Sequence, residues 1–119
     1  MMIAVTVALA AGAAGWSQAG EVDVVDVKAQ KSGSGWRFDV TVVHADTGWD
    51  HYADAWRVVG PDGTVYGTRI LAHPHVNEQP FTRSLGGVDI PEDVTRVKIE
   101  ARDSVHGWAG ATMEIDLVE

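Results

Sequence analysis

Five histidines carry the chemistry that this sequence offers: His44, His51, His73, His75 and His106. None of them precedes residue 44, and two belong to the triplet His73-Pro74-His75. Imidazole is the commonest protein ligand for transition metals and titrates near neutral pH. We therefore expect a divalent metal site if the fold brings these rings together.

The His73-Pro74-His75 triplet is the strongest local signal for a chelating pair. Proline fixes its own φ near −65° and biases the residue before it toward extended backbone. Residues two apart in an extended chain point to the same side. The rings of His73 and His75 are therefore predicted to form a stiff pair of ligands, with His44 and His106 as their companions.

The other histidines also have structural interpretations that need no metal. His44 can be a strand-end residue hydrogen-bonded to backbone, and His106, followed by Gly107, can be an ordinary turn residue. His51 lies between Asp50 and Tyr52 in a polar loop, where solvation alone would explain it.

The elements that must position these rings are predicted to be short β-strands. Turn signals recur at short intervals, no segment keeps a 3.6-residue period, and Trp36, Phe38 and Val40 fall on one face of an alternating run. The predicted strands are 21–28, 36–44, 54–59, 64–71, 80–85, 94–102 and 111–118, with a Gly/Ser-rich loop at 30–35. This pattern predicts an all-β fold, a seven-stranded antiparallel immunoglobulin-like or fibronectin-III-like β-sandwich, with Trp36 and Trp56 in its core.

Strand direction predicts where the histidines meet. If successive strands run antiparallel, the connections after the second, fourth and sixth strands lie at one end of the sandwich, and the turn Gly60-Pro61-Asp62-Gly63 lies at the other. All five histidines fall at the first end, together with the start of the first strand. His44 is an even number of residues from Trp36 and Phe38, so its side chain is also predicted to point into the core. A buried imidazole there needs a hydrogen-bonding or metal partner.

Residues 1–19 are predicted to be a signal peptide. Met1 to Gly15 is apolar or small and uncharged, too short for a comfortable membrane span, and Ser17-Gln18-Ala19 places small residues where a signal peptidase reads. No Lys or Arg precedes the apolar stretch, which departs from the usual pattern. The alternatives are an uncleaved strand or an anchor. We expect cleavage after Ala19, a single mature domain at 20–119 without a membrane span, and a periplasmic or secreted location.

Composition excludes several classes of protein. The chain has no cysteine, so disulfides, thiolate metal sites and a Cys nucleophile are ruled out. Its net charge of −8 makes nucleic acid and anionic lipid poor partners.

Carboxylates accompany the histidines in the same predicted loops: Asp46, Asp50, Asp54, Glu78 and Asp103. A carboxylate can bind the metal or orient a ligating histidine through its second nitrogen. We expect the orienting role for Asp54, Glu78 and Asp103. Arg83, which shares the inward parity of Phe81, marks a strand end or a bulge, or pairs with a buried carboxylate such as Asp103.

Three aromatic side chains, Trp49, Tyr52 and Trp108, are placed by the same topology at the histidine-bearing end. They either cap an apolar edge of the core or, in the case of Trp49 and Trp108, shield a metal or form a platform on which a ligand stacks.

These observations favour an exported protein that binds copper or zinc for carriage or buffering, since imidazole and carboxylate donors without sulfur suit these ions. The alternative is a non-enzymatic interaction module that binds a protein or another ligand through the same loops, anchored by Trp49, Tyr52 and Trp108. Catalysis by a three-histidine zinc site, with Asp54 or Glu78 as base, is a third option. The sequence holds no GxSxG, HExxH or phosphate-binding glycine loop to favour it.

Overall fold

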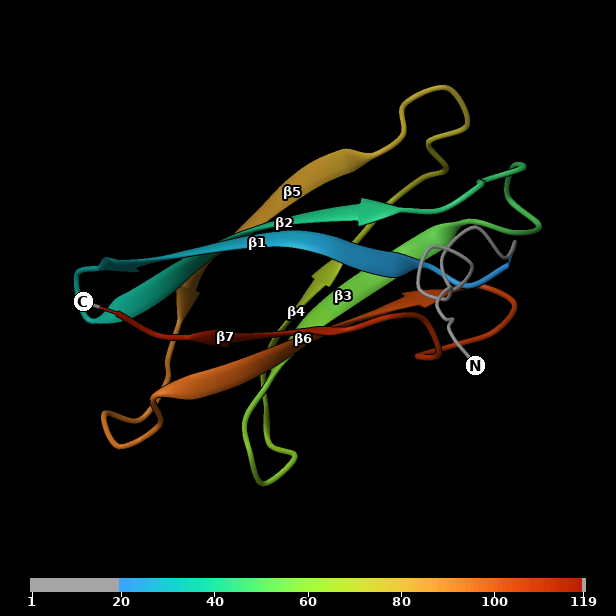
Figure 1. The fold of residues 1–119 in the computed structure, drawn as a ribbon. Helices are drawn as coiled ribbons and strands as arrows, with labels where there is room; N and C mark the ends of the chain where they lie inside the picture. The colour runs from blue at the N-terminus through green and yellow to red at the C-terminus, as the bar shows by residue number, and fades with distance from the viewer. Residues whose placement is uncertain (1–19, 119) are drawn as a thin grey trace, which may run out of the picture.

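The computed structural model describes residues 20–118 and consists of strands and loops (Figure 1). The strands are β1 (Asp23–Ser32), β2 (Gly35–Val43), β3 (Ala53–Val59), β4 (Val65–Ile70), β5 (Phe81–Val88), β6 (Arg96–Asp103) and β7 (Met113–Asp116). The predicted signal peptide lies outside the described residues. Within the described part of the chain, no helix is of a length and apolarity that would carry it across a membrane.

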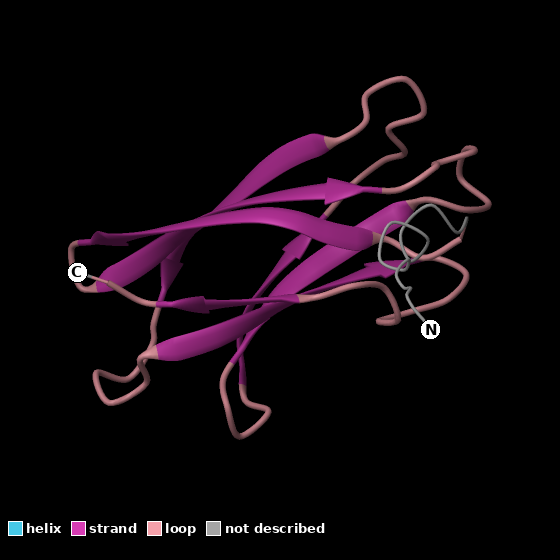
Figure 2. Ribbon diagram, in the orientation of Figure 1, coloured by secondary structure: helices cyan, strands magenta, loops and turns pink. Residues whose placement is uncertain are grey.

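The seven strands form two antiparallel sheets that face each other as two layers (Figure 2). The three-stranded sheet has the order β1-β2-β5, and the four-stranded sheet has the order β4-β3-β6-β7. The prediction of an all-β, seven-stranded antiparallel sandwich is therefore confirmed at the level of architecture.

Two-residue periodicity builds the core between the layers. Along β2 the side chains of Trp36, Phe38 and Val40 are buried while Arg37 is exposed, as alternation requires. Trp56 on β3 and Ile99 on β6 are fully buried from the opposite sheet. Trp36 and Trp56 are core residues, as predicted.

β1 and β5 run further than predicted, and glycine explains both extensions, whereas β7 is shorter than predicted. The expected loop at 30–35 is a two-residue turn, because Gly33 adopts a φ of +63° and lets β1 run to Ser32. β5 continues three residues past its predicted end at Leu85, through Gly87, whose φ is +66°. The register of β2 against β5 shifts between Trp36 and Phe38, opposite this extension.

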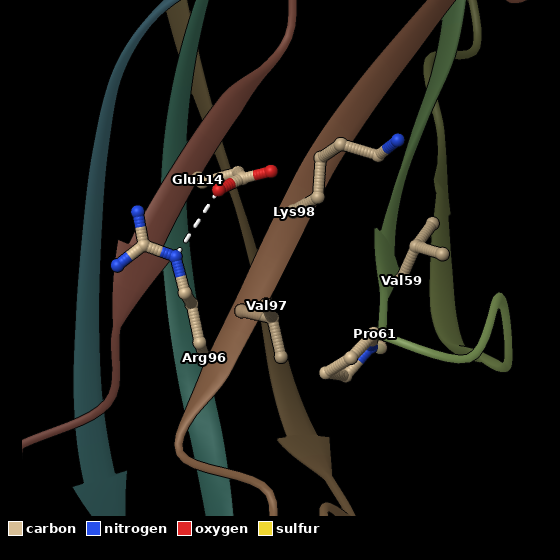
Figure 3. A pocket seen from close by; sticks show the side chains of 7 residues that line it. Val59, Pro61, Arg96, Val97, Lys98 and Glu114 are labelled. Carbon is tan, nitrogen blue, oxygen red and sulfur yellow. Dashed lines mark hydrogen bonds and ion pairs between the residues drawn. The ribbon is translucent and has the colours of Figure 1, made fainter.

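The connections β2–β3, β4–β5 and β6–β7 lie at one end of the sandwich, on the right of Figure 1. The tight turn after β3 lies at the other end, beside a shallow hollow of about 320 Å³. Figure 3 shows Val59, Pro61 and Val97 along this hollow, with Arg96 bonded to Glu114 at its rim. No histidine lines the hollow, so any imidazole chemistry belongs to the opposite end.

Candidate metal centre

Two imidazoles and one carboxylate meet at the histidine-bearing end of the sandwich. His44 follows β2 directly, His51 lies in the β2–β3 loop, and Asp103 is the last residue of β6. Each offers one ligand atom, and these atoms lie within 4.8 Å of one another. His44, His51 and Asp103 therefore form a group that could hold a metal ion.

The separations within the group match a coordination sphere. His44 Nε2 lies 3.3 Å from His51 Nε2, which lies 3.1 Å from Asp103 Oδ1. Ligand atoms placed about 2.0–2.1 Å from a tetrahedral ion are about 3.3 Å apart. The side chains are thus close enough to share one ion without rearranging the strands that carry them.

The carbonyl oxygen of Gly20 completes the cluster from the N-terminal side. It lies 3.0 Å from His44 Nε2 and 2.9 Å from His51 Nε2. A Cβ added to Gly20 would lie 2.6 Å from Cε1 of His106, and its φ of +119° also favours glycine. The backbone of Gly20 therefore packs directly against the imidazoles.

Asp46 sets the tautomer of His44. Asp46 Oδ1 accepts a hydrogen bond from His44 Nδ1 at 2.5 Å, and both side chains are fully buried. In the neutral ring the proton is therefore on Nδ1, so Nε2 presents its lone pair to Gly20 O and His51. Asp46 also accepts from the backbone N–H groups of Ala53 at 3.0 Å and His75 at 2.7 Å, which fixes its position.

Asp103 is a fully buried carboxylate that remains ionised. Burial alone would raise its pKa, but hydrogen bonds from the backbone N–H groups of His106 and Val105 and from the His106 ring outweigh burial and lower the pKa. Its second oxygen, Oδ2, has no hydrogen-bond partner among the described residues. A buried charge with an unpartnered oxygen suits cation binding.

His106 lies at the edge of this group. Its Nδ1 is 3.0 Å from Asp103 Oδ1, and its ring centroid is 5.1 Å from that of His51. His106 therefore contacts the carboxylate of the group, and within residues 20–118 its Nε2 has no hydrogen-bond partner.

His73 and His75 lie side by side, with ring centroids 4.6 Å apart, but outside the group formed by His44 and its partners. The ring of His75 stacks on Phe81 at 3.9 Å, and its Nε2 accepts a hydrogen bond from Arg83 at 2.8 Å. Burial, the Arg83 guanidinium and His73 lower the pKa of His75. His75 is thus held neutral, with Nε2 engaged by a cation. The exposed His73 ring bonds the carbonyl of Pro74.

The predicted orienting carboxylates have different partners. Asp103 is a candidate ligand in its own right, because it ends β6 on the inward side. Asp54 pairs with Arg102 at 3.1 Å; burial raises its pKa, although the Arg102 charge opposes this. Glu78 pairs with Arg83 at 3.5 Å. The suggested pairing of Arg83 with Asp103 was therefore wrong, because β5 places Arg83 beside the β4–β5 loop.

The aromatic side chains at this end are not buried. Trp49 is 67% exposed and meets Tyr52 edge-on, with ring centroids 5.5 Å apart. Trp108 lies under the guanidinium of Arg57 at 3.9 Å, on the outer face of the four-stranded sheet. Within residues 20–118, neither tryptophan makes a ring contact with His44 or His51.

Sequence reasoning named Asp46 among the loop carboxylates without assigning it a role, and it did not consider Gly20. Asp46 follows His44 by two positions, so parity alone places their side chains on the same side. Gly20 has no side chain, so a search for ligating side chains does not find it. Its signal is positional, since it is the first residue after the predicted cleavage point and leads into a strand that begins at the histidine-bearing end.

No protein-family model and no solved structure matches this sequence. A protein of Halomicrobium mukohataei described as "Putative lipoprotein" is 41% identical to it over 97 residues, which are 81% of this chain and 47% of that protein. The chain spans about half the length of the curated relative it matches. Over most of its own length, the chain is therefore similar to part of a protein described as a lipoprotein.

Proposed function

We propose that this chain is an exported protein that binds copper or zinc through His44, His51 and Asp103, for carriage or buffering of the ion. The observation that carries the proposal is a convergence of potential ligand atoms. Gly20 O, Asp103 Oδ1 and His44 Nε2 lie 2.9, 3.1 and 3.3 Å from His51 Nε2, which can supply at most one hydrogen to all three. A cation at this point would bind all four atoms.

The donor set supports copper or zinc over other ions. Imidazole nitrogens with one carboxylate suit Cu(II) and Zn(II), whereas calcium takes mainly oxygen ligands and a blue-copper centre requires a thiolate. Asp46, bonded to His44 Nδ1, is the kind of outer partner that orients a ligating histidine.

Carriage or buffering is supported by the openness of one side of the group. The side chain of His51 is 23% exposed, while those of His44 and Asp103 are fully buried. An ion could therefore enter and leave past His51, unlike one in a closed structural site.

Export is supported by the leader-like residues 1–19 and by the description of the similar protein as a lipoprotein. Within the sandwich class, we infer a fibronectin-III-like rather than an immunoglobulin-constant-like fold. β4 pairs with β3, whereas the fourth strand of an immunoglobulin constant domain belongs to the sheet of its first strand.

The test is calorimetric titration of the protein with Cu(II) and with Zn(II), using His51→Ala, Asp103→Asn and the matched control His73→Ala. We expect His51→Ala to weaken binding by about tenfold or more and His73→Ala, an exposed ring at the same end, to leave it unchanged. A dissociation constant weaker than about 1 μM for both ions would refute the proposal. Equal losses from His73→Ala and His51→Ala would favour the ligand pair predicted from the triplet instead.

The interaction module remains the second proposal, because Trp49 and Val105 are exposed at the same end. Such side chains are the anchors expected at a binding surface. Replacing Trp49 by Ala would abolish partner capture in the presence of a chelator if this function holds, and would leave metal affinity unchanged if the metal function holds.

A further inference from the structure

Gly20 carries an inference that deepens the proposed metal site and rests on it. We propose that the α-amine of Gly20, freed by cleavage after Ala19, is itself a metal ligand and makes this a Cu(II) site. In the cleavage, water hydrolyses the Ala19–Gly20 amide, leaving a carboxylate on Ala19 and an amine on Gly20. The new amine lies three bonds from the Gly20 carbonyl oxygen, which already contacts two imidazoles of the cluster.

The first support is the position of the Gly20 carbonyl oxygen, 2.9 and 3.0 Å from two imidazole Nε2 atoms. Neighbouring ligands about 2.0 Å from one ion lie about 2.8–3.3 Å apart, so this oxygen and both nitrogens can bind the same ion. The amine and carbonyl oxygen of one residue can close a five-membered chelate ring on such an ion. With His44, His51 and Asp103, the result is a set of three nitrogens and two oxygens, and tetragonal nitrogen and oxygen donors favour Cu(II).

The second support is that residues after Gly20 hold it in place. Val22 is fully buried, and its carbonyl is so close to Gly110 that a Cβ there would lie 1.5 Å from it. Val24 N–H donates to Ala111 O at 2.9 Å. The position of Gly20 therefore follows from contacts on its C-terminal side, and cleavage before it leaves those contacts in place.

The third support is that only glycine fits at residue 20. A Cβ at residue 20 would lie 2.6 Å from Cε1 of the His106 ring, so a side chain there would have to displace that imidazole. The predicted leader ends at Ala19 on grounds that involve no metal chemistry. The residue that follows it is nevertheless the one whose backbone enters the imidazole cluster.

The test compares full-length chains secreted by a host with a signal peptidase. One variant has a single glycine inserted between Ala19 and Gly20, which keeps the cleavage signal but turns the Gly20 nitrogen into an amide. A matched control has one glycine inserted between Gly33 and Ser34, in the turn at the other end of the sandwich. His51→Ala reports whether the side-chain site binds metal at all.

Mass spectrometry of the exported protein should give Gly20 as its first residue. The wild type and the turn control should bind Cu(II) equally. The insertion before Gly20 should weaken binding by about tenfold or more, because a ligand attached at the site acts at high effective concentration. Electron paramagnetic resonance of the Cu(II) complex should show one nitrogen ligand fewer in that variant.

Another first residue, or the same affinity and spectrum in both insertion variants, would overturn the inference. If both insertion variants bind Cu(II) equally and His51→Ala still weakens binding, the amine ligand is wrong while the proposed metal site stands. If none of the proteins binds Cu(II) or Zn(II), both proposals fail together.

Discussion

Replacing Asp46 by Asn should destabilise the fold and the proposed metal site together. The side chain is 6% exposed, and its two oxygens accept three hydrogen bonds, from His44 Nδ1, Ala53 N and His75 N. Asparagine offers one oxygen and one NH₂ group. If the oxygen keeps His44 and Ala53, the NH₂ group faces the N–H of His75, and a buried donor is left without an acceptor.

The magnitude follows from these bonds. An unsatisfied buried donor costs about 1–3 kcal/mol, and two bonds that lose their charge weaken by about 1 kcal/mol each. Relief from burying a carboxylate offsets part of this, so we expect a loss of about 2–4 kcal/mol in the free energy of unfolding. Metal affinity should fall about 10–100-fold, because the Nδ1–H tautomer of His44 is no longer enforced.

Urea denaturation of the metal-free protein measures the first effect, and competition titration measures the second. Asp50→Asn is the matched control, an exposed carboxylate in the same loop, and should change stability by less than about 0.5 kcal/mol. If Asp46→Asn is no less stable than Asp50→Asn, the hydrogen bonds assigned to Asp46 do not hold the loops together.

Three further predictions concern the sandwich around the site. Without metal, the free energy of unfolding should fall as pH drops through about 6.5, because the unfolded chain protonates residue 75 there while the folded pKa is lower. Urea titrations at several pH values should show a shallower slope for His75→Gln, and an unchanged slope would contradict the burial assigned to this ring. Trp56→Ala should cost about 3–5 kcal/mol by leaving a cavity between the sheets, measured by urea denaturation; a loss below about 1 kcal/mol would argue against a packed core. Gly110→Ala should displace the Val22 carbonyl and thereby weaken Cu(II) binding. The control Gly63→Ala, in an open turn at the other end, should alter stability alone. Equal Cu(II) affinities in the two variants would refute the link between the Val22 carbonyl and the metal site.

Strand positions were predictable because burial imposes a period of two. Trp36, Phe38 and Val40 mark β2 in the sequence, and the same parity places His44 inside, where the structure has it. Because successive strands run antiparallel, all five histidines fall at the same end of the sandwich. The strand ends at Ser32 and Val88 were missed because they depend on which glycine adopts a positive φ, and no periodic pattern encodes that choice.

The membership of the site was only partly predictable. His73 and His75 are paired locally, as Pro74 suggests, but Arg83 from the next strand engages the second ring. Asp103 alternates in step with the buried residues Val97, Ile99 and Ala101 along β6. This pattern would have predicted a buried carboxylate, and hence a candidate ligand rather than an orienting residue. Contacts between loops depend on how the connections fold over one another, which strand parity does not determine.

The group formed by His44, His51 and Asp103 spans the two layers of the sandwich. His44 extends β2 of the three-stranded sheet, and Asp103 ends β6 of the four-stranded sheet. In immunoglobulin domains a disulfide joins the second and sixth strands, B and F. In this cysteine-free chain, a reversibly bound metal ion would cross-link the ends of the corresponding strands, β2 and β6. Since an ion that binds only the folded state stabilises it by mass action, the resistance of the protein to heat and proteases would follow the free metal concentration around it.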